Sequence, residues 1–434
     1  MARKALSCLP LIALLFIYFS SPVSAAASDK PELKSETAIL MDGGTGQILF
    51  DKEMHRRMYP ASITKIMTAL LALERGTLDD TITMSDDAVS SIGRRSANIA
   101  LVPGEECTLE QALYALALVS ANEAANGIAE HIGGTMDGFA ALMNARARET
   151  GALNTNFVNA NGLNDDNHYT TAYDMARITL AAIKNPAFIK IFGALIYEMP
   201  PTNMQPQPRT FHCTNLMKRG RYQYEGIIVS KTGWTKQAQH TLVTVAEKDG
   251  RTLIAVVMKS GGKRDRWEDT TALLNYGFDN FTKIGFSAEE LSQGGVFTDK
   301  DFTCLIPSTL TKENVEITHV AASDANGEPI VKAVFTIKSS GFFAELGELE
   351  IQAALPVSAD AAGQTKVPAG NPVGKASTVP WFLGGVSLLL ICLARLFFVM
   401  KKRRSRRRPT GNIVIRLNQT PAGYALHGGR RRWR

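Results

Sequence analysis

Strand-like segments stand at both ends of a long helical stretch, and this order constrains the fold more than any other feature of the chain. Residues Thr37–Met54 read as two strands joined by the turn Asp42-Gly43-Gly44-Thr45-Gly46. Residues from about 77 to 190 carry mostly helical patterns, and strand patterns return from Gly226 to Ser260. The sequence therefore predicts one α+β domain, over residues 35–285, whose antiparallel sheet is completed by segments far apart in the chain.

Helices and a second domain are predicted around this sheet. Residues Ala61–Glu74 place apolar side chains at helical spacing, and a helix from about Asp269 to Ile284 closes the unit. Alternation with period two between Gly294 and Ala353 predicts a small all-β domain, with bounds near 290–355.

The N-terminus reads as an export signal. Arg3 and Lys4 precede the apolar stretch Leu9–Phe19, and small residues suited to cleavage follow. The pattern predicts a signal peptide over residues 1–26. A retained N-terminal anchor is the alternative.

The C-terminal part reads as a linker, a membrane span and a basic tail. Residues 356–378 are rich in Pro, Ala, Gly and Ser, and residues 379–400 are apolar enough for a transmembrane helix. The basic tail, residues 401–434, marks the cytoplasmic side and can touch anionic lipid. We therefore expect a single-pass protein of the cell membrane with its folded part on the extracytoplasmic face.

The basic character of the chain belongs to its ends. Twelve Lys or Arg and no Asp or Glu occur in the basic tail, and Arg3, Lys4 and Arg395 bring the terminal positive charges to fifteen. Subtracting these fifteen from the formal net charge of +7 leaves −8 for the rest of the chain. Specific binding of nucleic acid is therefore not expected.

Three cysteines remain once the predicted signal and span are set aside. Their odd number and wide spacing argue against a disulfide framework or a zinc site, although one disulfide stays open. The histidines, including His131 and His168, show no ligand spacing and are interpreted as structural, so no metal or other cofactor is expected. The three cysteines are Cys107, Cys213 and Cys304.

The segment Ser62-Ile63-Thr64-Lys65 opens the first predicted helix. A spacing of three puts the serine and the lysine on one helical face. A serine hydroxyl needs a base to become a nucleophile, and a lysine can be that base when burial lowers its pKa. Alone the motif is weak, because Ser260-Gly261-Gly262-Lys263 has the same spacing and reads as a loop after a strand.

Two further motifs follow. Ser120-Ala121-Asn122 ends an apolar run, and Lys231-Thr232-Gly233 ends the predicted strand Gly226–Ser230. A serine can relay a proton, and an asparagine amide can hold a carbonyl or orient a lysine. A Lys-Thr pair on an edge strand offers a cation and a hydroxyl to a carboxylate, and the glycine lets a substrate backbone lie close. Taken alone, each motif also reads as a helix cap or a strand-end turn.

Together and in order, the three motifs resemble the S-x-x-K, S-D-N and K-T-G set of β-lactamases and penicillin-binding proteins. The surrounding residues resemble the serine-type D-alanyl-D-alanine carboxypeptidases, a family of low-molecular-mass penicillin-binding proteins. The resemblance covers roughly residues 35–355, including the β domain behind the catalytic domain. The segments that carry it are Tyr59–Ala69, Val119–Ala125, Asn161-Gly162-Leu163, His168–Asp174 and Gly226–Thr235.

The resemblance implies a penicillin-binding, β-lactamase-like fold and an acyl-enzyme mechanism on peptidoglycan stem peptides, with β-lactam antibiotics as a second class of ligand. It implies that Ser62 attacks the carbonyl between two D-alanines and that Lys65 is the general base. The leaving D-alanine would take its proton through Ser120. The implied catalytic residues are Ser62, Lys65, Ser120 and Asn122, and the implied substrate-binding residues are Lys231, Thr232, Gly233 and Trp234, with the backbone N–H groups of Ser62 and Trp234 as the oxyanion hole.

Several positions depart from the family pattern. Ala121 stands where these carboxypeptidases have Gly and β-lactamases have Asp, which favours a cell-wall enzyme over a β-lactamase. The segment Ala97–Leu101 and the residues Gln237–His240 also diverge, so a different loop over the site is expected. The predicted membrane crossing differs from the amphipathic C-terminal helix of most relatives. A DD-endopeptidase or weak transpeptidase, a β-lactamase, and a non-catalytic membrane-tethered wall-binding protein stay open as alternatives.

Overall fold

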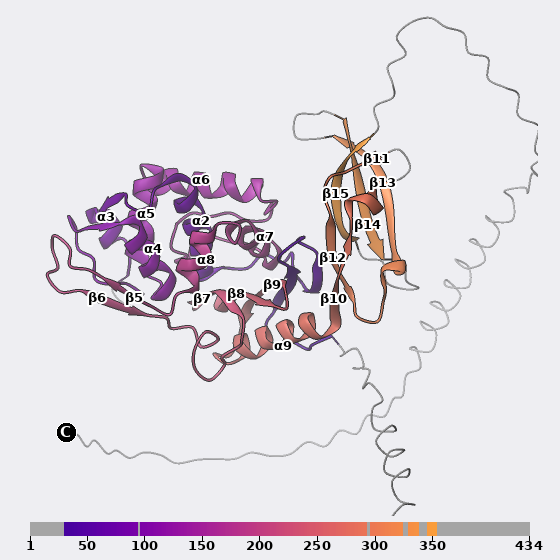
Figure 1. Cartoon of the computed structure of the whole chain (residues 1–434). Coiled ribbons are helices and arrows are strands. Elements are labelled where there is room, and N and C mark those ends of the chain that lie inside the picture. Colours follow the sequence, from indigo (N-terminus) through magenta and orange to yellow (C-terminus); the bar gives the residue numbers. More distant parts are fainter. Residues whose placement is uncertain (1–29, 94–95, 293–295, 324–328, 338–344, 354–434) are drawn as a thin grey trace, which may run out of the picture. The chain divides into compact units, whose positions relative to one another are not determined.

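The computed structural model describes residues 30–93, 96–292, 296–323, 329–337 and 345–353 (Figure 1). The chain divides into two units, 1–357 and 358–434, and every described residue belongs to the first. No helix among these described residues has the length and apolar character that crossing a membrane requires. The predicted segments that lie outside the described residues are the signal at 1–26, the linker at 356–378, the span at 379–400 and the tail at 401–434.

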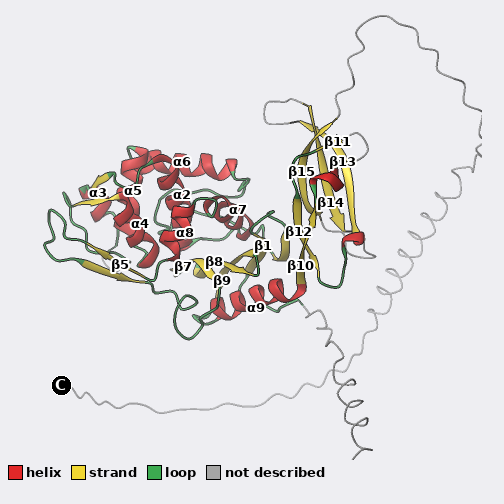
Figure 2. Cartoon of the chain, in the orientation of Figure 1, coloured by secondary structure: helices red, strands yellow, loops and turns green. Residues whose placement is uncertain are grey.

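A five-stranded antiparallel sheet forms the centre of the first domain, as the sequence predicts (Figure 2). Its strand order is β2-β1-β9-β8-β7, so the N-terminal hairpin pairs with strands from the far end of the domain and β7 lies at an edge. The bounds are β1 (Thr37–Asp42), β2 (Ile48–Lys52), β7 (Ile227–Thr235), β8 (Gln239–Lys248) and β9 (Arg251–Ser260).

Both faces of this sheet are buried because successive side chains of a strand point to opposite sides. In β1, Ile39 and Met41 join the core shared with the helical insert, whereas Ala38 and Leu40 pack with the apolar face of α9 (Asp265–Asn280). The sheet is therefore the middle layer between the insert and a single helix.

The insert supplies most of the helical layer. Polar side chains cap several of its helices; Thr108 and Gln111, for example, form a reciprocal capping box at the start of α4. The elements are η1 (Ala61–Thr64), α2 (Lys65–Arg75), α3 (Asp86–Ser90), α4 (Leu109–Leu118), α5 (Asn122–Gly133), α6 (Met136–Glu149), α7 (Ala172–Ala182) and α8 (Pro186–Gly193).

Two short antiparallel strand pairs in and after the insert were not predicted from the sequence. One pairs β3 (Thr81–Thr83) with β4 (Glu106–Thr108), and the other pairs β5 (Ile196–Met199) with β6 (Arg209–His212). Strands of three or four residues are too short to show a period of two, so the helical pattern around them dominated the prediction.

The predicted β domain is present as a strand-rich module. Its core centres on aromatic side chains, with the rings of Phe302 and Phe335 stacked at 3.8 Å between centroids. Gln47 joins it to the first domain by donating to the backbone oxygen of Leu305 at 2.7 Å. The elements are β10 (Phe281–Phe286), α10 (Ala288–Leu291), β11 (Val296–Phe297), β12 (Phe302–Pro307), η2 (Lys312–Asn314), β13 (Val315–Ser323), β14 (Pro329–Ile337) and β15 (Glu345–Ala353).

The last helix of the first domain ends earlier than predicted. The sequence pattern predicts a helix to about Ile284, but α9 stops at Asn280 and β10 begins at Phe281. The reason is tertiary, because the backbone of Phe281–Phe286 pairs with β12 and the two end phenylalanines are buried in different cores. A pairing partner 16 to 26 residues away leaves no mark on the local pattern.

Candidate active site

Ser62 lies in a strained turn ahead of the long helix α2. The preceding residue, Ala61, has φ +53°, a left-handed conformation that costs a non-glycine residue about 1–3 kcal/mol. Gly162 packs directly against this turn. A Cβ at position 162 would stand 2.0 Å from the backbone oxygen of Ala61, so only a glycine fits there. Such strain persists only where the surrounding structure enforces it, and here it presents a half-buried hydroxyl at the start of a helix.

Lys65 is the first residue of α2 and has no exposed surface. Its Nζ donates to Ser62 Oγ at 3.2 Å, to Asn122 Oδ1 at 2.6 Å and to the backbone oxygen of Asn161. Burial lowers the pKa of Lys65 well below its ordinary value, the positive charge of Lys231 lowers it further, and Glu123 opposes both. A lysine that loses its proton readily beside a serine hydroxyl can act as a general base.

Ser120 and Lys231 form a second contact in the same cluster. Lys231 Nζ donates to Ser120 Oγ at 3.0 Å and to the backbone oxygen of Thr232 at 2.9 Å. Desolvation lowers the pKa of Lys231 to about 7. Ser120 itself has φ +64°, a second strained residue at the junction of α4 and α5. The two lysines and two serines thus join three distant chain segments.

The third motif lies inside β7, whereas the sequence analysis placed it just after a strand ending at Ser230. A Cβ on Gly233 would stand 2.9 Å from the backbone nitrogen of Ser62, so only a glycine lets the edge strand approach the serine this closely. Thr241 fixes the approach by donating to the backbone oxygen of Pro60 at 2.9 Å.

The structure therefore brings the predicted residues of all three motifs to one place. Side-chain hydrogen bonds link Lys65 to Ser62 and Asn122, and a second bond links Lys231 to Ser120. Thr232 and Gly233 lie on the strand beside them, and the side chain of Trp234 is 61 % exposed next to Gly233.

Asn161 belongs to a segment that carries the family resemblance, and the structure gives it a role in the site. Its backbone oxygen accepts from Lys65, and its side chain donates to Asn126 Oδ1 at 2.8 Å. A backbone acceptor carries no side-chain signature, so only the tertiary arrangement could reveal it. His168, interpreted as structural, is buried and hydrogen-bonds Thr64 Oγ1 through Nε2 at 2.9 Å.

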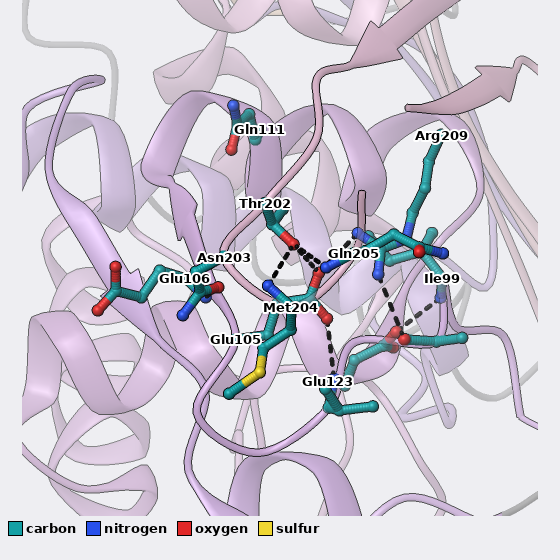
Figure 3. A network of polar contacts seen from close by, with 12 residues as sticks. Ile99, Glu105, Glu106, Gln111, Glu123, Thr202, Asn203, Met204, Gln205 and Arg209 are labelled. Atoms are coloured by element: carbon teal, nitrogen blue, oxygen red, sulfur yellow. Dashed lines mark hydrogen bonds and ion pairs between the residues drawn. The ribbon is translucent and has the colours of Figure 1, made fainter. Parts of the chain in front are cut away.

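Two buried carboxylates fasten the divergent segment Ala97–Leu101 and the residues just after it, one from the second motif and one through the β5–β6 hairpin (Figure 3). Glu123 accepts the backbone N–H of Ile99 at 2.6 Å, and burial raises its pKa. Glu105 forms an ion pair with Arg209 at 2.7 Å and accepts from Thr202 at the same distance, which ties the segment to the β5–β6 hairpin. The loop expected to differ is thus fastened from two sides.

Comparison with known proteins decides the family. The family model for D-alanyl-D-alanine carboxypeptidases, peptidase family S11, matches residues 24–262. The chain belongs to this carboxypeptidase family. Among curated members, it is 33% identical over 288 residues to the D-alanyl-D-alanine carboxypeptidase DacF of Bacillus subtilis, a match that covers 64% of this chain and 72% of that protein.

Solved carboxypeptidase structures agree. The D-alanyl-D-alanine carboxypeptidase of Mycobacterium tuberculosis H37Rv aligns with a TM-score of 0.54 and 30% identity, over 59% of this chain and 95% of that chain. The carboxypeptidase DacD of Francisella tularensis aligns with a TM-score of 0.58 over 78% of this chain and 98% of that chain, and at 22% identity it supports the fold alone. The penicillin-binding α+β fold that the sequence analysis expected is confirmed.

Proposed function

We propose that this carboxypeptidase removes the terminal D-alanine of peptidoglycan stem peptides through an acyl-enzyme on Ser62. One observation carries the assignment of residues. The buried amine of Lys65 contacts the hydroxyl of Ser62 at 3.2 Å, beside an edge strand whose own lysine contacts Ser120. A base, a nucleophile and a carboxylate-binding strand are the parts that serine acyl transfer to and from a peptide C-terminus requires.

Acylation uses the first two motifs. Neutral Lys65 takes the proton of Ser62 Oγ, and the oxygen attacks the carbonyl carbon between the two D-alanines. The backbone N–H groups of Ser62 and Trp234 stabilise the oxyanion, a contact worth about 3 kcal/mol per donor. The C–N bond then breaks, and the proton that Lys65 took passes through Ser120 to the departing amine, which leaves Lys65 neutral while Asn122 holds it in place.

Substrate placement and deacylation complete the cycle. Lys231 and Thr232 bind the terminal carboxylate, because a buried cation and a hydroxyl on an edge strand match its charge and shape. A water molecule then attacks the ester carbonyl, Lys65 takes the proton of the water, and the proton returns to Ser62 Oγ as the shortened peptide leaves. Penicillins would acylate Ser62 by the same first step.

Transpeptidation is a second candidate with the same acyl-enzyme. It is favoured by one relative, the DD-transpeptidase of Streptomyces K15, whose solved structures align at 29% to 30% identity with a TM-score of 0.54. Adding an amino-acid acceptor during turnover separates the two reactions. Carboxypeptidase activity releases free D-alanine and the shortened peptide, whereas transpeptidation yields a new peptide carrying the acceptor.

We further propose that the catalytic domain acts on the outer face of the cell membrane. The support is the sequence of the two ends, with their predicted signal, single span and basic tail. Protease added to intact spheroplasts tests this placement. The protease should degrade the catalytic domain if the domain is outside, and survival of the domain would show that it is internal.

Release of D-alanine from a pentapeptide tests the function. Ser62→Ala should abolish release, because no other hydroxyl contacts Lys65 among the described residues. Ser260→Ala is the matched control, since Ser260 starts the second S-x-x-K segment but bonds Ser35 instead. Release that survives in Ser62→Ala, or that is lost equally in Ser260→Ala, contradicts the assignment.

A further inference from the structure

A cavity of about 310 Å³ opens beside the catalytic cluster, and no step of the mechanism above uses it. It lies among the residues that precede the nucleophile, the turn between β7 and β8, and the end of β9. Its lining residues are Arg56, Arg57, Met58, Tyr59, Asp166, Tyr169, Gln237, Ala238 and Lys259. We call this cavity the basic pocket.

The basic pocket lies where the rest of the substrate must go. With the terminal carboxylate at Lys231 and Thr232, the scissile carbonyl comes opposite Gly233, which approaches Ser62. The peptide N-terminal to that bond therefore continues along β7 toward its end at Thr235 and the turn that holds Gln237 and Ala238. At about 3.5 Å per residue, the next two stem residues reach this turn.

The pocket carries more positive than negative charge. Arg56 and Lys259 both bind Glu36, at 3.1 Å and 3.0 Å, so two cations share one carboxylate. Arg57 lies over the ring of Tyr169, with its guanidinium carbon 4.6 Å from the centroid, and makes no ion pair within the described part of the chain. Asp166 is the acidic member of the lining.

The backbone at Lys259, one of these cations, departs from regular strand geometry. Lys259 has φ +56° and belongs to a bulge between β8 and β9, where the register shifts between His240 and Leu242. A bulge turns a side chain out of its regular alternation and is common beside active sites. Such strain persists only where the surrounding structure enforces it, and here the bulge places Lys259 in the lining of the pocket.

We propose that the basic pocket binds a free carboxylate on the acyl side of the stem peptide, with Arg57 as its main partner. This proposal rests on the proposed function, since it assigns a subsite for the same substrate. The carboxylate could be carried by either of the two residues that precede the acyl D-alanine, and the two sources have the same chemistry. Arg57 suits either, because its planar guanidinium pairs with a carboxylate through two parallel hydrogen bonds.

Four synthetic pentapeptides test the proposal and separate the two sources. One carries both carboxylates, two carry one amide each, and one carries both amides. We expect kcat/KM for D-alanine release to fall about five- to ten-fold when the recognised carboxylate is amidated, and the preference to weaken at high salt. Equal kcat/KM for all four peptides would overturn the proposal.

Variants assign the effect to Arg57. Arg57→Ala should remove the preference and leave the doubly amidated peptide unaffected, and Arg57→Lys should restore part of it. Arg221→Ala is the matched control, because Arg221 also lies over a tyrosine ring, that of Tyr222 at 5.9 Å, outside the pocket lining. An equal loss on all four peptides in Arg57→Ala would show a structural role instead.

A binding measurement keeps this test independent of turnover. Dissociation constants of the four peptides for Ser62→Ala, measured by calorimetry, should show the same order as the kinetics. Acylation by a penicillin with an uncharged side chain monitors the serine itself. Normal acylation without peptide discrimination refutes the pocket alone, whereas absent acylation with intact discrimination refutes the proposed chemistry alone.

Discussion

Two buried lysines with different tasks stand at the centre of the site. Lys65 must be neutral to take a proton, and Lys231 must be charged to hold a carboxylate. Desolvation lowers the pKa of both, and the charge of Lys231 lowers that of Lys65 further. The different surroundings of the two lysines therefore suit Lys65 to act as a base and Lys231 to act as an anion-binding cation.

The pH dependence of kcat/KM follows from this separation. The rate should rise with pH as Lys65 loses its proton, and fall as Lys231, with a pKa of about 7 in the free enzyme, loses its own. Lys231→Arg keeps its charge at all accessible pH values, so the alkaline limb should disappear even if the maximal rate is lower. A profile of D-alanine release from pH 5 to 10 measures this, and an unchanged alkaline limb in the variant argues against the role of Lys231.

At the scale of elements, the close approach of β7 to the turn containing Ser62 is the feature on which reactivity depends. Gly233→Ala would place a Cβ 2.3 Å from Thr241 Oγ1 and 2.9 Å from the backbone nitrogen of Ser62. The strand must then move away from the proposed oxyanion hole, and we expect penicillin acylation to slow about 100-fold. Gly261→Ala is the control, because its nearest neighbour is 3.8 Å away. Equal acylation rates in the two variants would contradict this geometry.

The buried ion pair between Glu105 and Arg209 joins two elements, because it connects the segment before β4 to the β5–β6 hairpin. Arg209→Ala leaves a fully buried carboxylate without its cation, and we expect a loss of about 3 kcal/mol in the free energy of unfolding. Lys190→Ala, which removes an exposed pair with Glu110 at 3.6 Å, should cost less than about 1 kcal/mol. Urea denaturation of both variants compares them, and similar losses would show that the buried pair does not anchor the hairpin.

The molecule as a whole shows which features a sequence can reveal. The sheet, the helical insert and the three motifs were predictable because each has a local pattern or a fixed spacing. The end of α9 at Asn280 and the acceptor role of Asn161 were not, because each depends on a partner far along the chain. The β5–β6 hairpin was not, because its strands are too short to show a period of two. The basic pocket belongs to the same group, since Arg57, Asp166 and Lys259 meet only in the folded protein.

The central claim is that distant segments fold together so that the Lys65 amine activates the Ser62 hydroxyl. Mass spectrometry of the protein after brief exposure to a penicillin, followed by peptide mapping, tests it most directly. We predict a single adduct on Ser62 in the wild type and acylation at least about 100-fold slower in Lys65→Ala. An adduct on another residue, or an undiminished rate without Lys65, would contradict the account.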